Sequence, residues 1–119
     1  MIIGIGVDLI EVSRVVKACQ KESFQFKVFT KNEIELMKTD IKKAADNFAV
    51  KEAVVKMFGT GFRFISPIEI EVLRNKAGRP YVNLYGRAAE LAKQQGVTMI
   101  HVSISNTKDY ANAFVVGEA

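Results

Sequence analysis

The chain is poor in the residues on which several kinds of protein depend. It has one cysteine, Cys19, among 119 residues, so neither an internal disulfide nor a thiolate zinc cluster is expected, and a reducing compartment is indicated. Tryptophan is absent, and no aromatic pair is interleaved with the basic residues, so features that stack on or read nucleic acid are missing. No segment reaches the roughly 18 apolar residues that a membrane helix needs. We therefore expect a protein that binds neither nucleic acid nor membrane.

The length and the first residues of the chain favour one small intracellular domain. With 119 residues, 49% hydrophobic and 25% charged, the chain is long enough to bury one core, so we expect residues 1–119 to form a single domain. Met1 to Val7 is apolar and lacks the basic region and the small-residue cleavage site of a signal peptide. A cytoplasmic location is expected from this pattern.

The order of hydrophobic patterns along the chain predicts strands and helices that pack into one α+β domain. The predicted strands are Met1 to Leu9, Ile68 to Leu73, Tyr81 to Tyr85, Met99 to Ser105 and Tyr110 to Val116. The predicted helices follow Asp8, begin at the cap Thr30, cover Lys43 to Phe58 and cover Arg87 to Gln95. Phe24 to Phe29 is predicted as an aromatic turn, and Asp40 to Asp46 as a polar connection. We expect an antiparallel sheet packed on helices.

Basic side chains recur on one face of the first predicted helix. The chain has 17 basic and 13 acidic residues, a net charge of +4 that suits an anionic partner without naming one. Arg14, Lys17 and Lys21 follow each other at i, i+3 and i+7, beside an apolar flank that includes Val12 and Val15. A charge run of this kind is ordinarily a solvated helix face. An anionic partner is the alternative.

Two carboxylates in distant segments are the strongest candidates for chemistry. Asp8 follows Gly4 and Gly6 in the first strand, and Glu52 lies in the longest predicted helix. At about 4 Å the two would repel by about 4 kcal/mol for an effective dielectric near 20, and Mg²⁺ would relieve that repulsion. Lys56 lies one helical turn after Glu52 and would reach the same phosphate. Considered singly, Glu52 and Lys56 are explained by a surface ion pair, and Asp8 by a strand-end cap.

Two common phosphate-binding motifs are incomplete in this chain. Gly4 and Gly6 begin a dinucleotide motif, but Leu9 stands where its third glycine is required. The segment Gly59 to Gly61 is not followed by the lysine and hydroxyl residue that complete a P-loop. A phosphate must therefore be held in another way.

Four segments together resemble the 4'-phosphopantetheinyl transferases. They are Gly4 to Arg14, Phe48 to Gly61, His101 to Thr107 and the turn Gly78 to Pro80. Within that superfamily the chain is similar to the short type, the holo-acyl-carrier-protein synthases, over nearly its whole length. The resemblance implies the 4'-phosphopantetheinyl transferase fold and a homotrimer with active sites between subunits. It also implies transfer of the phosphopantetheine arm of coenzyme A to a serine of an acidic acyl carrier protein, with release of adenosine 3',5'-bisphosphate.

The resemblance assigns roles to individual residues. Asp8 and Glu52 match the family's Mg²⁺ ligands, and together with Lys56 they are the expected catalytic residues. Either Glu52 or a metal-bound water would accept the proton of the serine. The residues expected to bind coenzyme A are Lys51, Lys56, Gly59, Thr60, Gly61, Pro80, Ser103, Ser105, Asn106 and Thr107.

The resemblance also gives the basic stripe a partner. Arg14, Lys17 and Lys21 stand where the family docks its acyl carrier protein, and opposite charges there would speed the encounter of the two proteins. An acidic carrier protein is therefore the expected partner of this helix.

Two positions depart from the family's usual residues. Asn106 stands where a histidine is usual and Asn47 where an arginine is common, and asparagine offers a phosphate only neutral donors. His101 is expected to be an ordinary strand residue, because it lies on the strand face opposite Ile100. Two alternatives to an active transferase follow: a homologue that binds acyl carrier protein or coenzyme A without turnover, and an oligomeric scaffold with inherited motifs.

Overall fold

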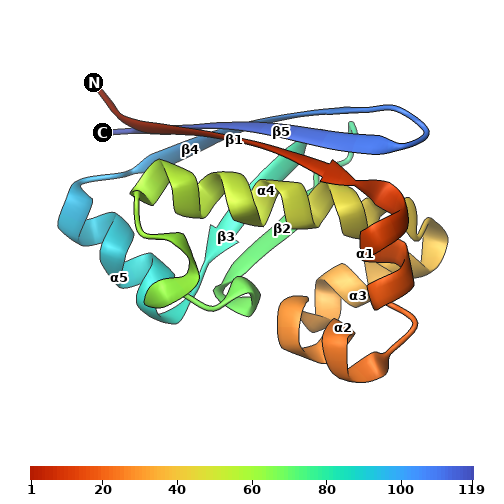
Figure 1. The fold of residues 1–119 in the computed structure, drawn as a ribbon. Coiled ribbons are helices and arrows are strands. Elements are labelled where there is room, and N and C mark those ends of the chain that lie inside the picture. Colours follow the sequence, from red (N-terminus) through yellow and green to blue (C-terminus); the bar gives the residue numbers. More distant parts are fainter.

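The computed structural model describes residues 1–119, and its helices and strands largely follow the predicted order (Figure 1). The strands are β1 (Ile2–Glu11), β2 (Ile70–Arg74), β3 (Pro80–Leu84), β4 (Met99–Asn106) and β5 (Tyr110–Glu118). The α-helices are α1 (Val12–Ala18), α2 (Glu22–Val28), α3 (Lys31–Thr39), α4 (Lys42–Phe58) and α5 (Gly86–Gln95). Two short 3₁₀ turns, Gly61–Arg63 and Pro67–Glu69, lie between α4 and β2. None of the helices has the length and apolar character that a membrane crossing requires.

The strands form two antiparallel sheets. The larger sheet has the order β1-β5-β4, and β2 and β3 make a separate hairpin. Asp8 of β1 pairs with Ala113 of β5, and Ser105 of β4 pairs with Asn112 of β5, so β1 and β4 are the two edge strands. The predicted antiparallel α+β fold is confirmed, with the difference that the strands divide between two sheets.

Helix α4 lies between the larger sheet and the rest of the molecule (Figure 1). Ala45, Ala49 and Ala53 recur every four residues, share one face of the helix and are fully buried. On the sheet, Ala111 and Ala113 of β5 are fully buried as well. Small side chains on both surfaces allow the helix to approach the sheet closely.

Two glycines of β1 extend this close contact to the edge of the sheet. A Cβ atom on Gly6 would collide with the backbone carbonyl of Ala53, and one on Gly4 would collide with the next turn of α4. Backbone atoms cannot give way as a flexible side chain can, so both positions require glycine for the approach itself. Asp8 is the next residue on the same face of β1 and therefore points toward α4.

Two segments differ from the sequence predictions. The segment predicted as an aromatic turn forms α2, in which the ring of Phe24 packs edge-on against Phe29 at a centroid distance of 6.2 Å. The segment predicted as a polar connection contains the first turn of α4, where Ala44 and Ala45 are fully buried. In both places charged residues interrupt the apolar pattern, and burial by distant segments decides the structure.

Candidate functional site

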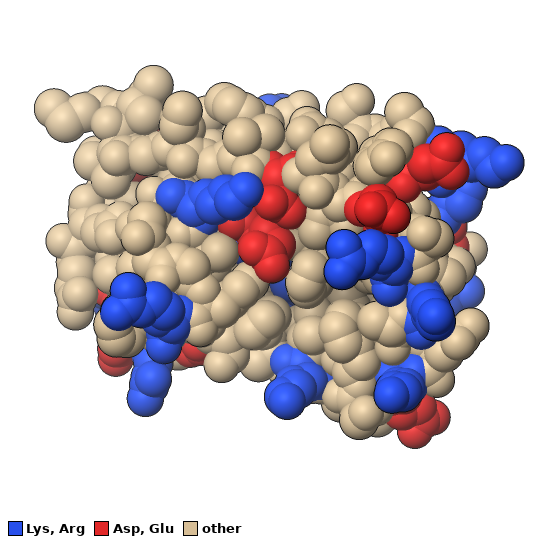
Figure 2. Space-filling model, in the orientation of Figure 1, with Lys and Arg blue, Asp and Glu red and all other residues tan.

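Asp8, Glu52 and Lys56 lie together where β1 passes over α4. The Nζ atom of Lys56 is 2.9 Å from Oδ1 of Asp8 and 3.0 Å from the backbone oxygen of Val7. The Asp8 side chain is 15% exposed and that of Lys56 is 53% exposed, so the pair is open to solvent on one side. Figure 2 shows acidic side chains gathered near the middle of this face, between separate basic groups.

The second carboxylate of the group is held in an unfavourable charge environment. Burial raises the pKa of Glu52, and the negative charge of Asp8 raises it further, whereas Lys56 lowers it. A divalent cation would remove this conflict. Mg²⁺ is usually bound by one or two carboxylates together with water and substrate phosphates, so this pair has the donor set that Mg²⁺ requires.

Lys51 points into the interior, although it is the sequence neighbour of Glu52. It is fully buried, and its Nζ donates to Oε1 of Glu33 at 2.8 Å, to the backbone oxygen of Pro67 at 2.9 Å and to that of Ile70. An ammonium group has three hydrogens to donate, and all three are used here. We therefore correct the prediction that Lys51 binds coenzyme A.

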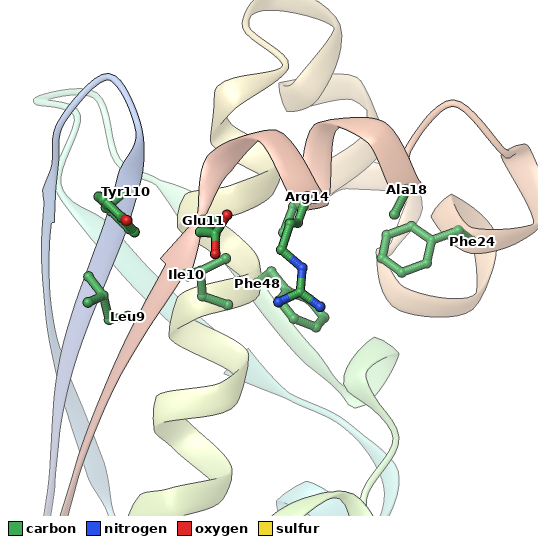
Figure 3. Close-up of a pocket in the computed structure, with 9 residues that line it drawn as sticks. Leu9, Ile10, Glu11, Arg14, Ala18, Phe24, Phe48 and Tyr110 are labelled. Atoms are coloured by element: carbon green, nitrogen blue, oxygen red, sulfur yellow. The ribbon is translucent and has the colours of Figure 1, made fainter.

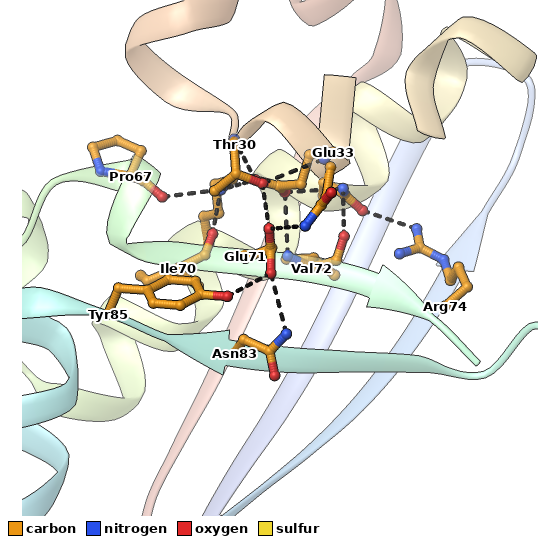
Figure 4. Close-up of polar contacts among 12 residues, drawn as sticks. Thr30, Glu33, Pro67, Ile70, Glu71, Val72, Arg74, Asn83 and Tyr85 are labelled. Carbon is orange, nitrogen blue, oxygen red and sulfur yellow. Dashed lines mark hydrogen bonds and ion pairs between the residues drawn. The ribbon is translucent and has the colours of Figure 1, made fainter. Parts of the chain in front are cut away.

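Glu33 is the centre of a buried polar network (Figure 4). Besides Lys51, its carboxylate accepts from the backbone nitrogen of Thr30 at 3.0 Å and from that of Val72 at 3.2 Å. Burial raises the pKa of Glu33 and lowers the pKa of Lys51, while the pairing of the two opposes both shifts. The predicted capping box of α3 is confirmed, because the Thr30 hydroxyl accepts from the Glu33 nitrogen in return.

Asn47 belongs to the same network. Its Nδ2 donates to Glu33 at 3.0 Å and to the backbone oxygen of Val72 at 2.9 Å, and its Oδ1 accepts from Nη2 of Arg74 at 2.9 Å. Asn47 is fully buried, so it contacts the protein interior and not a ligand. Arg74 of β2 places its guanidinium beside Asn47, the position at which the family commonly has an arginine.

A second buried carboxylate ties α3 to the β2–β3 hairpin. Glu71 accepts four hydrogen bonds from neutral donors, and no cation touches it. The donors are the hydroxyls of Thr30 at 2.6 Å and Tyr85 at 2.8 Å, and the amides of Asn83 at 3.1 Å and Asn32 at 3.3 Å. Burial opposes its ionisation, but these bonds together lower the pKa of Glu71.

Asn106 and Thr107 line a cleft of about 480 Å³ where the β4–β5 turn meets the start of α4. The other lining residues are Val12, Asp40, Lys42, Lys43, Asp46 and Lys108. Sequence reasoning missed the three lysines, because two begin α4 and the third lies in a turn some 65 positions away. Their only local signal is that Lys108 directly follows the motif residue Thr107. The three lysines outnumber the carboxylates of Asp40 and Asp46, so the cleft keeps an excess of positive charge that suits phosphate.

The remaining residues predicted to bind coenzyme A lie in other places. Ser103 and Ser105 are exposed on the face of the larger sheet that is turned away from α4. Gly59 and Gly61 enclose Thr60 at the end of α4 and have φ angles of 81° and 62°, a left-handed backbone that favours glycine. Pro80 begins β3 in the second sheet. Within one chain, the residues predicted to bind coenzyme A therefore lie on several separate surfaces.

The basic stripe follows two elements and not one helix. Arg14 and Lys17 lie on α1, which ends at Ala18, whereas Lys21 caps the start of α2. The expectation that one helix carries all three is therefore wrong. The three side chains nevertheless line one hollow of about 460 Å³, together with Ala18 and Phe24. The bend between α1 and α2 keeps them on one surface.

An apolar pocket of about 510 Å³ adjoins this basic hollow. Figure 3 shows the rings of Phe24 and Phe48 and the Arg14 guanidinium directed toward it. Its other lining residues are Leu9, Ile10, Glu11, Val15, Ala18 and Tyr110. The surface of α1 thus combines positive charge with an apolar pocket.

Comparisons with known proteins identify the family. Residues 4–115 match the family model of the 4'-phosphopantetheinyl transferase superfamily. The holo-[acyl-carrier-protein] synthase of Lachnoclostridium phytofermentans is 63% identical over 118 residues, which cover 99% of this chain and 97% of that protein. The crystal structure of holo-[acyl-carrier-protein] synthase from Neisseria meningitidis has a TM-score of 0.89 at 30% identity and covers 100% of both chains. That of the Bacillus anthracis protein, in complex with CoA (3',5'-ADP), has a TM-score of 0.83 at 33% identity and covers 100% of this chain and 98% of that one. This chain belongs to the 4'-phosphopantetheinyl transferase superfamily.

Replacing Lys51 tests its internal role. Lys51→Met keeps the length of the side chain but leaves the Glu33 carboxylate buried without a cation, so we expect unfolding in urea to need about 3–5 kcal/mol less free energy. The matched control is Lys38→Met, which breaks the exposed pair with Glu35 and should cost less than about 1 kcal/mol. Equal losses in the two variants would show that Lys51 is not the structural cation.

The same variant should acquire a pH dependence of stability. Without Lys51, the pKa of Glu33 in the folded state rises further above its unfolded value, so the folded state retains a proton that the unfolded state releases. The stability of Lys51→Met should therefore fall as the pH rises above the ordinary glutamate pKa of about 4.3. Glu33→Gln in addition should remove this slope, because the amide cannot ionise.

Proposed function

We propose that the protein transfers the 4'-phosphopantetheine group of coenzyme A to a serine hydroxyl of apo acyl carrier protein. The reaction depends on Mg²⁺ and releases adenosine 3',5'-bisphosphate. The observation that carries this proposal is the grouping of Asp8, Glu52 and Lys56 at one solvent-accessible point. The 63% identity to a holo-[acyl-carrier-protein] synthase over nearly the whole chain supports it.

Each residue of this group has a defined task. Asp8 and Glu52 would hold Mg²⁺, which when bound supplies electrophilic polarisation of the phosphorus and offsets charge on the leaving phosphate. Lys56, whose side chain is half-exposed, has the freedom to reach from Asp8 to the phosphates and would donate to their oxygens. The serine proton passes either to Glu52 or to a water held beside it.

The nucleotide part of coenzyme A needs a second set of residues. The cleft of Lys42, Lys43 and Lys108 is the best candidate in this chain for phosphate groups, and it contains the motif residues Asn106 and Thr107. Asn106 lies on β4, whereas Asp8 lies on β1, with β5 between these two edge strands. The membership of the family implies a site between two subunits, in which the cleft of one chain would face the carboxylates of the next.

The outer face of the larger sheet supports assembly as a homotrimer. Large apolar side chains on this face are exposed, a state that is uncommon for a monomer and typical of an interface. They include Ile5, Val7, Leu9, Met99 and Phe114. Ser103 and Ser105 lie on the same face, as does His101, whose Nε2 is 2.9 Å from Oε1 of Glu118. Copies joined through this face would bring these residues to a neighbouring subunit.

The surface of α1 fits an acidic carrier protein. Arg14, Lys17 and Lys21 line the basic hollow, and the adjoining apolar pocket would receive a hydrophobic side chain of the carrier. The pocket begins at Leu9 of β1, one residue after Asp8, so a docked carrier would bring its serine near the carboxylates. We also propose a cytoplasmic location, where the free thiol of Cys19 would remain reduced.

The activity is tested by incubating the protein with apo acyl carrier protein, coenzyme A and Mg²⁺ and measuring the mass of the carrier. We expect the wild type to add one phosphopantetheine group. Asp8→Ala and Glu52→Ala should each lower the rate at least about a hundredfold. Each removes a proposed Mg²⁺ ligand and with it the stabilisation of charge in the transition state. Glu35→Ala, which changes an exposed carboxylate on α3, is the control and should retain full activity.

The same assay separates the alternatives. Wild-type protein that binds the carrier but adds no mass is the binding homologue, and protein that does neither is the scaffold. Full activity in Asp8→Ala or Glu52→Ala, with unchanged folding by circular dichroism, would show that the metal site is misplaced.

Carrier docking is tested by reversing a charge on α1. Lys17→Glu should raise KM for the carrier about tenfold with little change in kcat, because it weakens encounter and not chemistry. Lys76→Glu, in the exposed β2–β3 turn, makes the same change in net charge and should leave KM within about twofold. An equal rise in both variants would mean that net charge alone attracts the carrier.

Assembly is tested at the centre of the outer face. Phe114→Glu should shift the sedimentation mass from three chains to one and abolish transfer, because a carboxylate cannot be buried there without a partner. Tyr81→Glu on β3 is a matched control, since the two aromatic residues are 42% and 41% exposed. A wild-type protein that sediments as one chain at assay concentration would exclude the trimer.

A further inference from the structure

The Asn106 side chain is oriented by a buried carboxylate. Its Nδ2 is 3.1 Å from both Oδ1 and Oδ2 of Asp46, and Asp46 itself is only 8% exposed. A carboxylate accepts hydrogen bonds and cannot donate them, so the amide nitrogen and not the amide oxygen must face Asp46. The orientation of the amide is therefore fixed by chemistry.

This orientation leaves the amide oxygen as the free end of the side chain. Asn106 is exposed and lines the cleft, and its Oδ1 accepts no hydrogen bond from the protein. An amide oxygen repels a phosphate, and so does the negative charge of Asp46 behind it. Sequence reasoning expected Asn106 to offer a neutral donor to a phosphate. The structure instead places an acceptor in the cleft.

The lysines of the cleft can bind phosphate without Asn106, so Asn106 is available for a different contact. Lys42, Lys43 and Lys108 supply three cations for anionic oxygens, which is the chemistry that phosphate requires. An adenosine nucleotide also carries neutral donors, namely the 6-amino group of adenine and the 2'-hydroxyl of the ribose. An oriented acceptor beside a phosphate site is suited to one of these donors.

We propose that Asn106, held by Asp46, is a specificity-determining residue that accepts a hydrogen bond from a neutral donor of the nucleotide, while the lysines hold its phosphates. This inference rests on the proposed function, because it takes the nucleotide of coenzyme A as the ligand. Asp46 acts as a positioning residue, since it orients the amide of Asn106.

The test measures nucleotide binding to the intact protein by calorimetry. The ligands are adenosine 3',5'-bisphosphate, its inosine and 2'-deoxyadenosine counterparts, and adenosine 5'-monophosphate. Wild-type protein should bind one of the two altered bisphosphates about fivefold more weakly, the value of one neutral hydrogen bond. A loss with inosine identifies the 6-amino group as the donor, and a loss with 2'-deoxyadenosine identifies the 2'-hydroxyl.

Two variants, one at the end of β4 and one in the turn that follows it, separate the acceptor role of Asn106 from the phosphate contact of Lys108. Asn106→Ala should remove this discrimination and leave the preference for the bisphosphate over the monophosphate within about twofold of wild type. Lys108→Ala should do the reverse and reduce that preference about tenfold, as expected for a hydrogen bond to a charged group. Asp46→Asn leaves Asn106 in place but removes the charge that orients it, so discrimination should fall while phosphate preference remains.

Several results would overturn the proposal. If Asn106→Ala loses as much of the preference for the bisphosphate over the monophosphate as Lys108→Ala does, then Asn106 contacts a phosphate. If wild-type protein binds all three bisphosphates equally, neither the 6-amino group nor the 2'-hydroxyl donates to Asn106. Because wild-type transfer from coenzyme A is measured beforehand, either result would leave the proposed function standing. A wild type that neither transfers nor binds the bisphosphate would remove the function, and this inference with it.

Discussion

The backbone contact between α4 and β1 determines where the reactive side chains lie. Gly6 lets the strand meet the helix at the carbonyl of Ala53, and backbone groups in contact have little freedom to shift. Ala53 directly follows Glu52, and Asp8 lies two residues beyond Gly6 on the same face of the strand. The carboxylates are therefore positioned by two rigid elements and not by loops, which is the arrangement that precise catalysis favours.

The other sides of α4 serve a different purpose. The helix meets the larger sheet through alanines, but it meets β2 and α3 through the paired charges of Lys51 and Glu33 and the amide of Asn47. A buried ion pair adds little net stability, yet it is costly to break or misplace. The polar layer therefore favours one rotation of α4 over others. Adjacent residues of one motif divide the work, since Lys51 fixes the helix and Glu52 faces the site.

Local patterns predicted much of the fold and part of the site. The capping box at Thr30, the glycine that ends α4 and the last hairpin depend on neighbours in sequence, and the structure confirms all three. The assignment of Asp8 and Glu52 to one metal site depends on the resemblance of whole motifs to a family, since each residue considered singly has a simpler structural explanation. The helix α2 depends on the packing of Phe24 with the distant ring of Phe48, which no local pattern records. The inward direction of Lys51, and the lysines gathered around Asn106, likewise arise only when remote segments meet.

Glu33 links three elements through a single carboxylate. It caps α3, pairs with Lys51 of α4 and accepts the backbone nitrogen of Val72 in β2. A nine-residue helix alone in water is marginal and would fray readily. Here fraying would strip a buried ammonium of its counter-charge, so the first turn of α3 opens only together with the core. We therefore expect the amide hydrogens of this turn to exchange with solvent more slowly than those of an isolated helix of nine residues.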